Sequence, residues 1–336
     1  MPVLGLGFIV LAVIAVVGVG SELVLGHLRG SAGAAAPTAT AQASQRAARP
    51  VPAALAADTP ARGTASADSA PCRVLASGVA LPEDVHESSG AAWSPRGGGL
   101  LWTHNDSGDP ELVGVDQGGV ERARVRLTGA TVTDWEDIAA APCPGGNCLY
   151  VADIGDNRAA RPNVTVYRVA EPAAGATATA PADRLNATYP DGPQDAEAIF
   201  VLPDGTLHVV SKGETGPASL YRFPQPLRPG ATVMLEKVAG ISAAVLERSS
   251  RITGASASPD GRWVAVRTLR SLSLYPTQNG GLRTLSNPVV MDLRGLKEAQ
   301  GEGVAMGDGG VVFLTSEAGG KKTPATFARL ACTLPG

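Results

Sequence analysis

The chain repeats one pattern of apolar and polar positions five times. In each copy a run of small apolar residues leads into a tight turn and a second apolar strand leaves it, with copies anchored at positions 89, 136, 197, 253 and 302. The turn of the third copy, Pro203-Asp204-Gly205, is typical of a β-hairpin. The intervals of 47, 61, 56 and 49 residues match the length of one four-stranded blade. The pattern predicts an all-β protein, a β-propeller of five blades, or of six if the register slips in the longest interval.

The later strands of the copies support this register. Tyr167-Arg168 and Tyr221-Arg222 occupy the same place in the second and third copies, and residues 233–238 are expected to complete the third. The fifth copy lacks a fourth strand, and the segment that begins at Cys72 can supply it. We therefore expect antiparallel blades, with N- and C-terminal strands closing the ring in one blade.

The N-terminal part of the chain has a different composition from the repeats. Residues 3–20 form an uninterrupted apolar run of 18 residues, so 1–30 is interpreted as a signal peptide or membrane anchor. A basic segment before the run is missing, and this charge bias alone would place the rest of the chain in the cytoplasm. Residues 31–70 are rich in Ala, Pro and Thr and are expected to form a disordered linker. The propeller is assigned to 71–336.

The four cysteines argue for export. Cys143 and Cys148 flank one hairpin tip, and Cys72 and Cys332 lie at the two ends of the repeat region, so two disulfides are predicted. The alternative is four free buried thiols. Paired cysteines imply an oxidising, extracytoplasmic location, either secreted or membrane-anchored. The net charge of −3 and pI near 5.9 give no basic surface for nucleic acid, and a monomer is expected.

Polar residues at equivalent positions of the copies are the candidate functional site, because the innermost strands of all blades line one central channel. Two columns of such residues flank the start of each inner strand. The first column is Glu87, Asp134, Asp195, Arg251 and Gln300, and the second is Ser89, Glu136, Glu197, Thr253 and Glu302. The ends of the second strands add His104, Asn105 and Asp106, then Asp153, Asp156 and Asn157, then Lys212, Arg267 and Glu317.

Carboxylates that lie close together at one rim repel each other unless a positive charge neutralises them. Three interpretations stay open: a structural network neutralised by Lys212, Arg251 and Arg267, a cation site, or a catalytic acid and base pair. For a metal, the ligands would be Glu136, Glu197 and Glu302, and their oxygens would favour calcium.

Individual residues carry weaker signals of the same kind. His104 is a candidate general base. The loop with Asp153 and Asp156 fits either a calcium ligand set or an Asx turn. The sequence contains no G-x-S-x-G, H-E-x-x-H or P-loop motif, so nothing in it supports a serine hydrolase, zincin or P-loop mechanism.

Three segments resemble known propeller families. The turn at 258–263, Ser-Pro-Asp-Gly-Arg-Trp, is similar to the repeat of TolB-type propellers. Residues 301–305 resemble the inner strand of phytase-like (esterase-like activity of phytase) and strictosidine-synthase-like propellers, and 153–158 resemble an exported actinobacterial branch of propeller proteins. The phytase-like name implies calcium and phosphoester chemistry. The lysines and arginines that hold phosphate in phytases have only scattered matches here, so no catalytic residue is carried over.

These observations lead to two functional hypotheses. In the first, the chain is a binding or scaffold module of the cell envelope, with an acidic channel mouth for a small ligand or cation and loops for a protein or glycan. In the second, it is a calcium-dependent phosphoesterase or esterase-like hydrolase, in which Lys212 and Arg267 hold the substrate anion.

Overall fold

The computed structural model describes residues 71–213, 217–241, 251–277, 288–320 and 323–334. The expected leader at 1–30 and linker at 31–70 lie outside the described residues. Within the described residues, no helix has the length and apolar content needed to cross a membrane.

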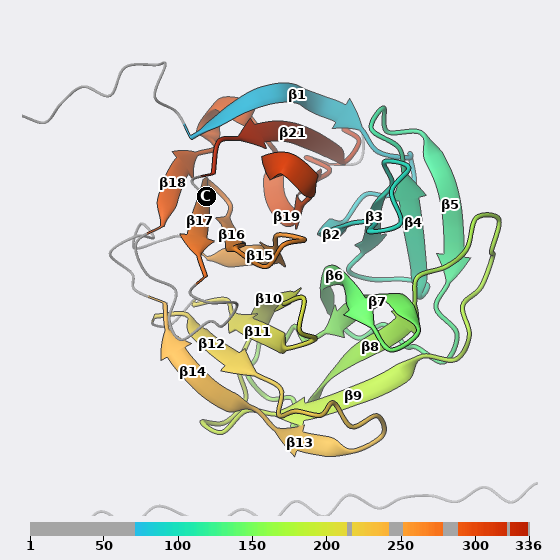
Figure 1. Cartoon of the computed structure of the whole chain (residues 1–336), viewed down its shortest axis with the longest axis vertical. Coiled ribbons are helices and arrows are strands. Elements are labelled where there is room, and N and C mark those ends of the chain that lie inside the picture. Colours follow the sequence, from blue (N-terminus) through green and yellow to red (C-terminus); the bar gives the residue numbers. More distant parts are fainter. Residues whose placement is uncertain (1–70, 214–216, 242–250, 278–287, 321–322, 335–336) are drawn as a thin grey trace, which may run out of the picture. The chain divides into compact units, whose positions relative to one another are not determined.

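Five β-sheets stand in a ring as the blades of a propeller, which confirms the predicted fold and blade number (Figure 1). Blade 1 contains β2 (Ser88–Trp93), β3 (Leu101–Asn105), β4 (Glu111–Val115) and β5 (Glu121–Arg126). Blade 2 contains β6 (Trp135–Cys143), β7 (Gly146–Asp153), β8 (Val164–Ala170) and β9 (Asp183–Thr188). Blade 3 contains β10 (Ala196–Val201), β11 (Leu207–Ser211), β12 (Ser219–Arg222) and β14 (Glu236–Gly240). Blade 4 contains β15 (Ile252–Ala257), β16 (Trp263–Thr268), β17 (Ser271–Pro276) and β18 (Val289–Asp292).

Blade 5 joins the two ends of the propeller. It contains β19 (Gln300–Met306), β20 (Val311–Glu317), β21 (Thr326–Cys332) and the N-terminal strand β1 (Cys72–Ala80). β1 pairs antiparallel with β21, and Cys72 lies directly opposite Cys332 in this register. The predicted disulfides Cys72–Cys332 and Cys143–Cys148 are both present, and the structure describes no free cysteine. The closure predicted from the missing fourth strand is therefore confirmed.

The segment expected as one outer strand of blade 3 is divided between two blades. β13 (Thr232–Met234) pairs in parallel with β9 of blade 2, whereas β14 pairs antiparallel with β12 of blade 3. Leu235 separates them; its side chain is buried in the core between the two blades, and its N–H donates to Thr188 O at 2.9 Å. Burial of Leu235 thus holds the point where the chain passes from blade 2 to blade 3. The sequence analysis expected one strand here and did not predict this division.

Five hydrophobic clusters hold the ring together, one at each interface between neighbouring blades. The aligned Tyr167 and Tyr221 belong to two of them: Tyr167 packs between blades 1 and 2, and Tyr221 between blades 2 and 3. Burial of one such large apolar side chain is worth about 2 kcal/mol, so most of the cohesion between blades is hydrophobic.

The inner strands β2, β6, β10, β15 and β19 converge on the centre of the ring (Figure 1). At their closest approach the aligned residues are small, except for one aspartate: Gly90, Asp137, Ala198, Gly254 and Gly303. A Cβ on Gly90 would lie 2.6 Å from Ile138 N, and one on Gly254 would lie 2.7 Å from Glu302 O. Glycine is required at these two positions because the neighbouring backbones leave no room for a side chain.

Candidate functional site

A polar cavity of about 290 Å³ opens where the inner strands begin. We call it the acidic mouth, and it is lined by Ser89, Asp106, Asp134, Glu136, Asn157, Glu197, Lys212, Arg251, Thr253, Leu269, Gln300, Glu302 and Glu317. Equivalent positions of all five blades contribute to it, which is why residues far apart in the sequence meet there. The whole second column of aligned residues lines the cavity, as the repeat register predicted.

In three blades the same backbone hydrogen bond places a residue that follows the second strand beside the first-column residue that precedes the inner strand. The N–H groups of Asp106, Gly155 and Lys212 donate to the carbonyls of Glu87, Asp134 and Asp195, at 3.2, 3.2 and 2.9 Å. In the other blades, Glu317 pairs with Gln300, and Leu269 follows the last residue of β16. Blades 1, 3, 4 and 5 thereby place a residue at or directly after the end of the second strand in the cavity lining, and blade 2 contributes Asn157 from the loop that follows β7.

Lys212 neutralises the carboxylates of blade 3. Its Nζ lies 2.5 Å from Glu197 Oε1 and 3.3 Å from Asp195 Oδ2. Burial raises the pKa of Glu197, and the Lys212 ammonium opposes that shift. These carboxylates raise the pKa of Lys212 against the effect of its burial, so the ammonium stays charged.

Glu302, on the opposite side of the mouth, differs from Glu197 in its protonation. Its side chain is buried and accepts a hydrogen bond from Gln300 Nε2 at 2.8 Å. Burial raises the pKa of Glu302 to about 8, with a smaller contribution from the charge of Glu197. Near neutral pH its carboxyl group is therefore mostly protonated and can donate a hydrogen bond or a proton.

A second protonatable group lies in blade 1. Burial and the neighbouring Glu87 raise the pKa of Asp106 to about 7. Glu87 accepts a hydrogen bond from Ser107 Oγ at 2.5 Å, and this contact lowers its pKa. Burial and Glu87 also raise the pKa of Glu317. Burial and the charge of Glu87 thus disfavour ionisation of Asp106 and Glu317.

The predicted residues His104 and Arg267 do not line the cavity. His104 is fully buried, its Nδ1 lies 3.0 Å from Asn105 O, its ring packs edge-on against Trp135, and burial lowers its pKa to about 4. Arg267 is also fully buried; it pairs with Glu298 and donates to the carbonyls of Gly303 and Thr315 at 2.8 and 2.7 Å. The proposed substrate contact of Arg267 is therefore wrong, because its guanidinium joins blades 4 and 5 and does not reach the mouth.

The predicted residues Asp153 and Asp195 are not among the residues that line the cavity, and both bind other protein groups. Asp153 pairs with Arg161 at 2.9 Å, and Arg161 donates in addition to Gly155 O at 2.8 Å. Asp156 accepts from Arg161 N at 2.7 Å, and its own N–H donates to Asp195 Oδ1 at 2.9 Å. The acidic loop at 153–156 is thus organised by Arg161, which the sequence analysis did not predict. The backbone N–H that Asp156 binds is five residues further on, so this contact is not an Asx turn.

The predicted calcium ligands share the mouth but do not form a metal site. No group of three or more Asp, Glu, His or Cys side chains in the described part of the chain is arranged to hold a metal ion. Lys212 already occupies one face of Glu197, and Glu302 is paired with Gln300. The donors present at Glu136, Glu197 and Glu302 therefore do not fit calcium.

Asp137 is a further polar residue that the sequence analysis did not single out. It is fully buried at the centre of the ring, between the inner strands. Its Oδ1 accepts from Ile138 N at 2.8 Å, and its Oδ2 accepts from Ile199 N at 2.9 Å and from Ala255 N at 3.2 Å. The signal was available, because Asp137 is the one large residue in a column of glycine and alanine. One carboxylate thereby ties blades 2, 3 and 4 together.

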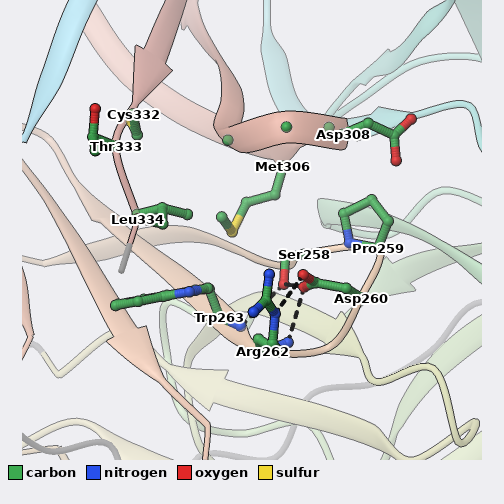
Figure 2. A pocket seen from close by; sticks show the side chains of 13 residues that line it. Ser258, Pro259, Asp260, Arg262, Trp263, Met306, Asp308, Cys332, Thr333 and Leu334 are labelled. Atoms are coloured by element: carbon green, nitrogen blue, oxygen red, sulfur yellow. Dashed lines mark hydrogen bonds and ion pairs between the residues drawn. The ribbon is translucent and has the colours of Figure 1, made fainter. Parts of the chain in front are cut away.

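The opposite ends of the inner strands form a second opening. A cavity of about 140 Å³ there is lined by small apolar residues, Trp93, Met306, Ser256, Ser258, Asp308 and four prolines at matching positions of the repeat, Pro95, Pro142, Pro203 and Pro259. We call it the proline mouth. Beside it, a groove of about 410 Å³ lies between blades 4 and 5. Figure 2 shows Met306 pointing into this groove toward Trp263, with the ion pair of Asp260 and Arg262 at its margin.

Comparisons with known proteins give structural likeness without a family. No protein-family model matches the sequence, and no curated protein matches it. The PQQ-bound aldose sugar dehydrogenase of Streptomyces coelicolor is 12% identical with a TM-score of 0.49, covering 78% of this chain and 98% of that one. A gluconolactonase of Xanthomonas campestris is 14% identical with a TM-score of 0.41, covering 79% and 96%. The calcium-binding protein regucalcin of Agrobacterium tumefaciens is 12% identical with a TM-score of 0.41, covering 76% and 95%.

Similarity at this level transfers neither substrate nor cofactor to this chain. The resemblance to phytase-like and TolB-type propellers is not confirmed by these comparisons.

Proposed function

We propose that this chain is a ligand-binding propeller whose acidic mouth binds a small cationic molecule. The observation that carries the proposal is the excess of carboxyl groups around one open cavity. Asp106, Asp134, Glu136, Glu197, Glu302 and Glu317 line it, whereas Lys212 and Arg251 are its basic residues. Burial and mutual repulsion raise the pKa of all six carboxyl groups, so a cation that enters relieves repulsion and is attracted to the cavity.

An extracytoplasmic location is part of this proposal. Both disulfides support it, because paired cysteines persist in oxidising compartments. The ring that Cys72–Cys332 closes is a rigid support for a binding site, and in this proposal the protein acts as a binding module of the cell envelope.

A hydrolase is the second candidate, and Glu302 is the observation that favours it. A buried carboxyl group with a pKa of about 8 can act as a general acid near neutral pH. Phosphoesters suit this cavity poorly, because its carboxylates repel an anion and Arg267 is not available to bind one. An uncharged or cationic ester is the better substrate class.

Thermal unfolding of the oxidised full-length chain tests the binding function. After treatment with EDTA, midpoints are compared in calcium chloride and in salts of small organic cations at one ionic strength. A cation that binds the native state raises the midpoint by mass action in a saturable way. The exposed Glu83→Gln variant controls for net charge and should keep the shift. Absence of a saturable shift with every cation would overturn the binding function.

The hydrolase candidate has its own test. Release of acid from ethyl acetate, whose ethoxide leaving group must be protonated to depart, is compared between the wild type and Glu302→Gln, which keeps the size of the side chain and removes its proton donor. Turnover that falls at least about a hundredfold in the variant supports general acid catalysis. Equal rates in both proteins would rule out this role of Glu302.

A further inference from the structure

Two equivalent pairs of carboxylates in the acidic mouth differ in one respect. Asp134 and Glu136 in blade 2 occupy the same positions as Asp195 and Glu197 in blade 3, before and within the inner strand. In blade 3 the ammonium group of Lys212 lies 3.3 Å from the first carboxylate and 2.5 Å from the second. The propeller thus contains one pair that already binds a primary ammonium group.

Glycine replaces the lysine in blade 2. The N–H of Gly155 donates to Asp134 O in the way that the N–H of Lys212 donates to Asp195 O. A Cβ at Gly155 would lie 2.2 Å from Glu136 Oε1 and 2.5 Å from Asp134 Oδ2. The two carboxylates therefore extend over the space that a side chain at this position would need.

Within the described residues, no basic side chain forms an ion pair with Asp134 or Glu136. The positive charges that lower the pKa of Asp134 are those of Arg161 and Lys212, and both form ion pairs elsewhere, with Asp153 and with the carboxylates of blade 3. Their charges reach Asp134 only at longer range. The pair in blade 2 is thus the less neutralised of the two.

Glu136 carries the second observation. The residue is about 7% exposed and lines the cavity. The hydrogen bond from Ser89 Oγ to its Oε2 is long, at 3.4 Å, and within the described residues its Oε1 accepts none. An almost buried carboxylate without a good donor is costly, and a donor that arrives with a ligand removes that cost.

We propose that Asp134 and Glu136 bind a primary ammonium group of the ligand, in the way that Asp195 and Glu197 bind Lys212. This proposal rests on the proposed function and specifies its ligand class as a primary amine. An ammonium group has three N–H donors, enough for one bond to each carboxylate and one to Ser89 Oγ. A quaternary ammonium group has the charge without the donors, so it should bind more weakly.

Titration calorimetry with methylammonium, using tetramethylammonium at equal ionic strength as the matched control, tests this site in the oxidised full-length chain. At about pH 8.5, wild type should bind methylammonium at least about tenfold more tightly than tetramethylammonium, since charge-assisted hydrogen bonds are the difference. Glu136→Gln should weaken methylammonium binding at least about tenfold. Glu317→Gln removes one carboxylate from the same cavity but not from the pair, and should weaken it less than about threefold.

Gly155→Ala is a second, independent variant: its Cβ would lie 2.2 Å from Glu136 Oε1 and 2.5 Å from Asp134 Oδ2, so it displaces the carboxylates of the pair. Methylammonium binding should be lost in this variant, while circular dichroism reports whether the blades still fold. If this variant does not fold, Glu136→Gln still tests whether the pair binds methylammonium, because that change keeps the size of the side chain.

The outcomes separate this proposal from the proposed function. Equal weakening in Glu136→Gln and Glu317→Gln, or equal binding of both probes, would show general attraction by the mouth and overturn the ammonium site alone. Wild type that binds neither probe nor any other cation would overturn the proposed function as well.

Discussion

The acidic mouth and the proline mouth are the two ends of the same five inner strands, and they have opposite chemistry. At one end, the starts of these strands present Glu136, Glu197 and Glu302. At the other end, matching positions of the repeat present Pro95, Pro142, Pro203 and Pro259 over small apolar residues. The same ring therefore has one opening lined by six carboxyl groups and another in which Asp308 is the one charged lining residue among those described. The chemistry of a ligand is thus set by the side chains at each end and not by the fold.

The narrow part of the ring keeps the two openings apart. Gly90, Gly254 and Gly303 let the inner strands approach closely, and Asp137 fills the remaining centre. Electrostatic repulsion is thereby confined to one mouth, where solvent and a ligand can relieve it. Asp137 is the exception, since it is a buried carboxylate that three backbone N–H groups stabilise.

Removal of the Asp137 carboxylate should have the largest effect. Asp137→Ala leaves three backbone N–H groups from three blades without an acceptor, and should lower the free energy of unfolding by about 4 kcal/mol. Asp137→Asn keeps one acceptor oxygen and should cost less. Urea unfolding of the oxidised protein measures both, and an Ala variant as stable as wild type would show that the carboxylate does not join the blades.

A change at Glu302 should have an intermediate effect that depends on pH. Its folded-state pKa of about 8 is raised above the ordinary value of 4.5, so its contribution to stability is complete below about pH 4.5 and is lost as the pH rises through 8. Glu302→Gln stays neutral. Its melting temperature relative to wild type should therefore rise by a few degrees between about pH 5 and pH 9.

Thermal melts of both proteins across this pH range provide the measurement. A difference in melting temperature that does not change with pH would mean that Glu302 titrates normally. Such a result would also remove the basis for Glu302 as a general acid.

A change in the proline mouth should have the smallest effect. Pro259 is exposed at a turn, and Pro259→Ala should change the free energy of unfolding by less than about 1 kcal/mol, mainly through the unfolded chain. Cation binding should be unaffected, since the two mouths are at opposite ends of the strands. Calorimetry that showed weaker cation binding in this variant would contradict the separation of the two ends.

The sequence determined the repeat and much of the acidic mouth. The spacing of the copies predicted five blades, the position of Cys72 predicted the closure, and the second column of aligned residues predicted the lining of the cavity. This worked because a propeller places equivalent residues of successive blades at one level, so a position in the repeat is also a position in space.

Only the tertiary structure decided how each charged group is used. Arg267 and His104 follow the same repeat as Lys212, yet they point into the interfaces between blades and not into the mouth. Arg161 binds the acidic loop from outside the repeat pattern. The repeat gives the level of a residue along the strand, whereas the direction of its side chain and its partners depend on packing between neighbouring blades. Lys212 therefore neutralises the carboxylates of Asp195 and Glu197 in blade 3, while the equivalent Asp134 and Glu136 of blade 2 have no such ion pair within the described residues.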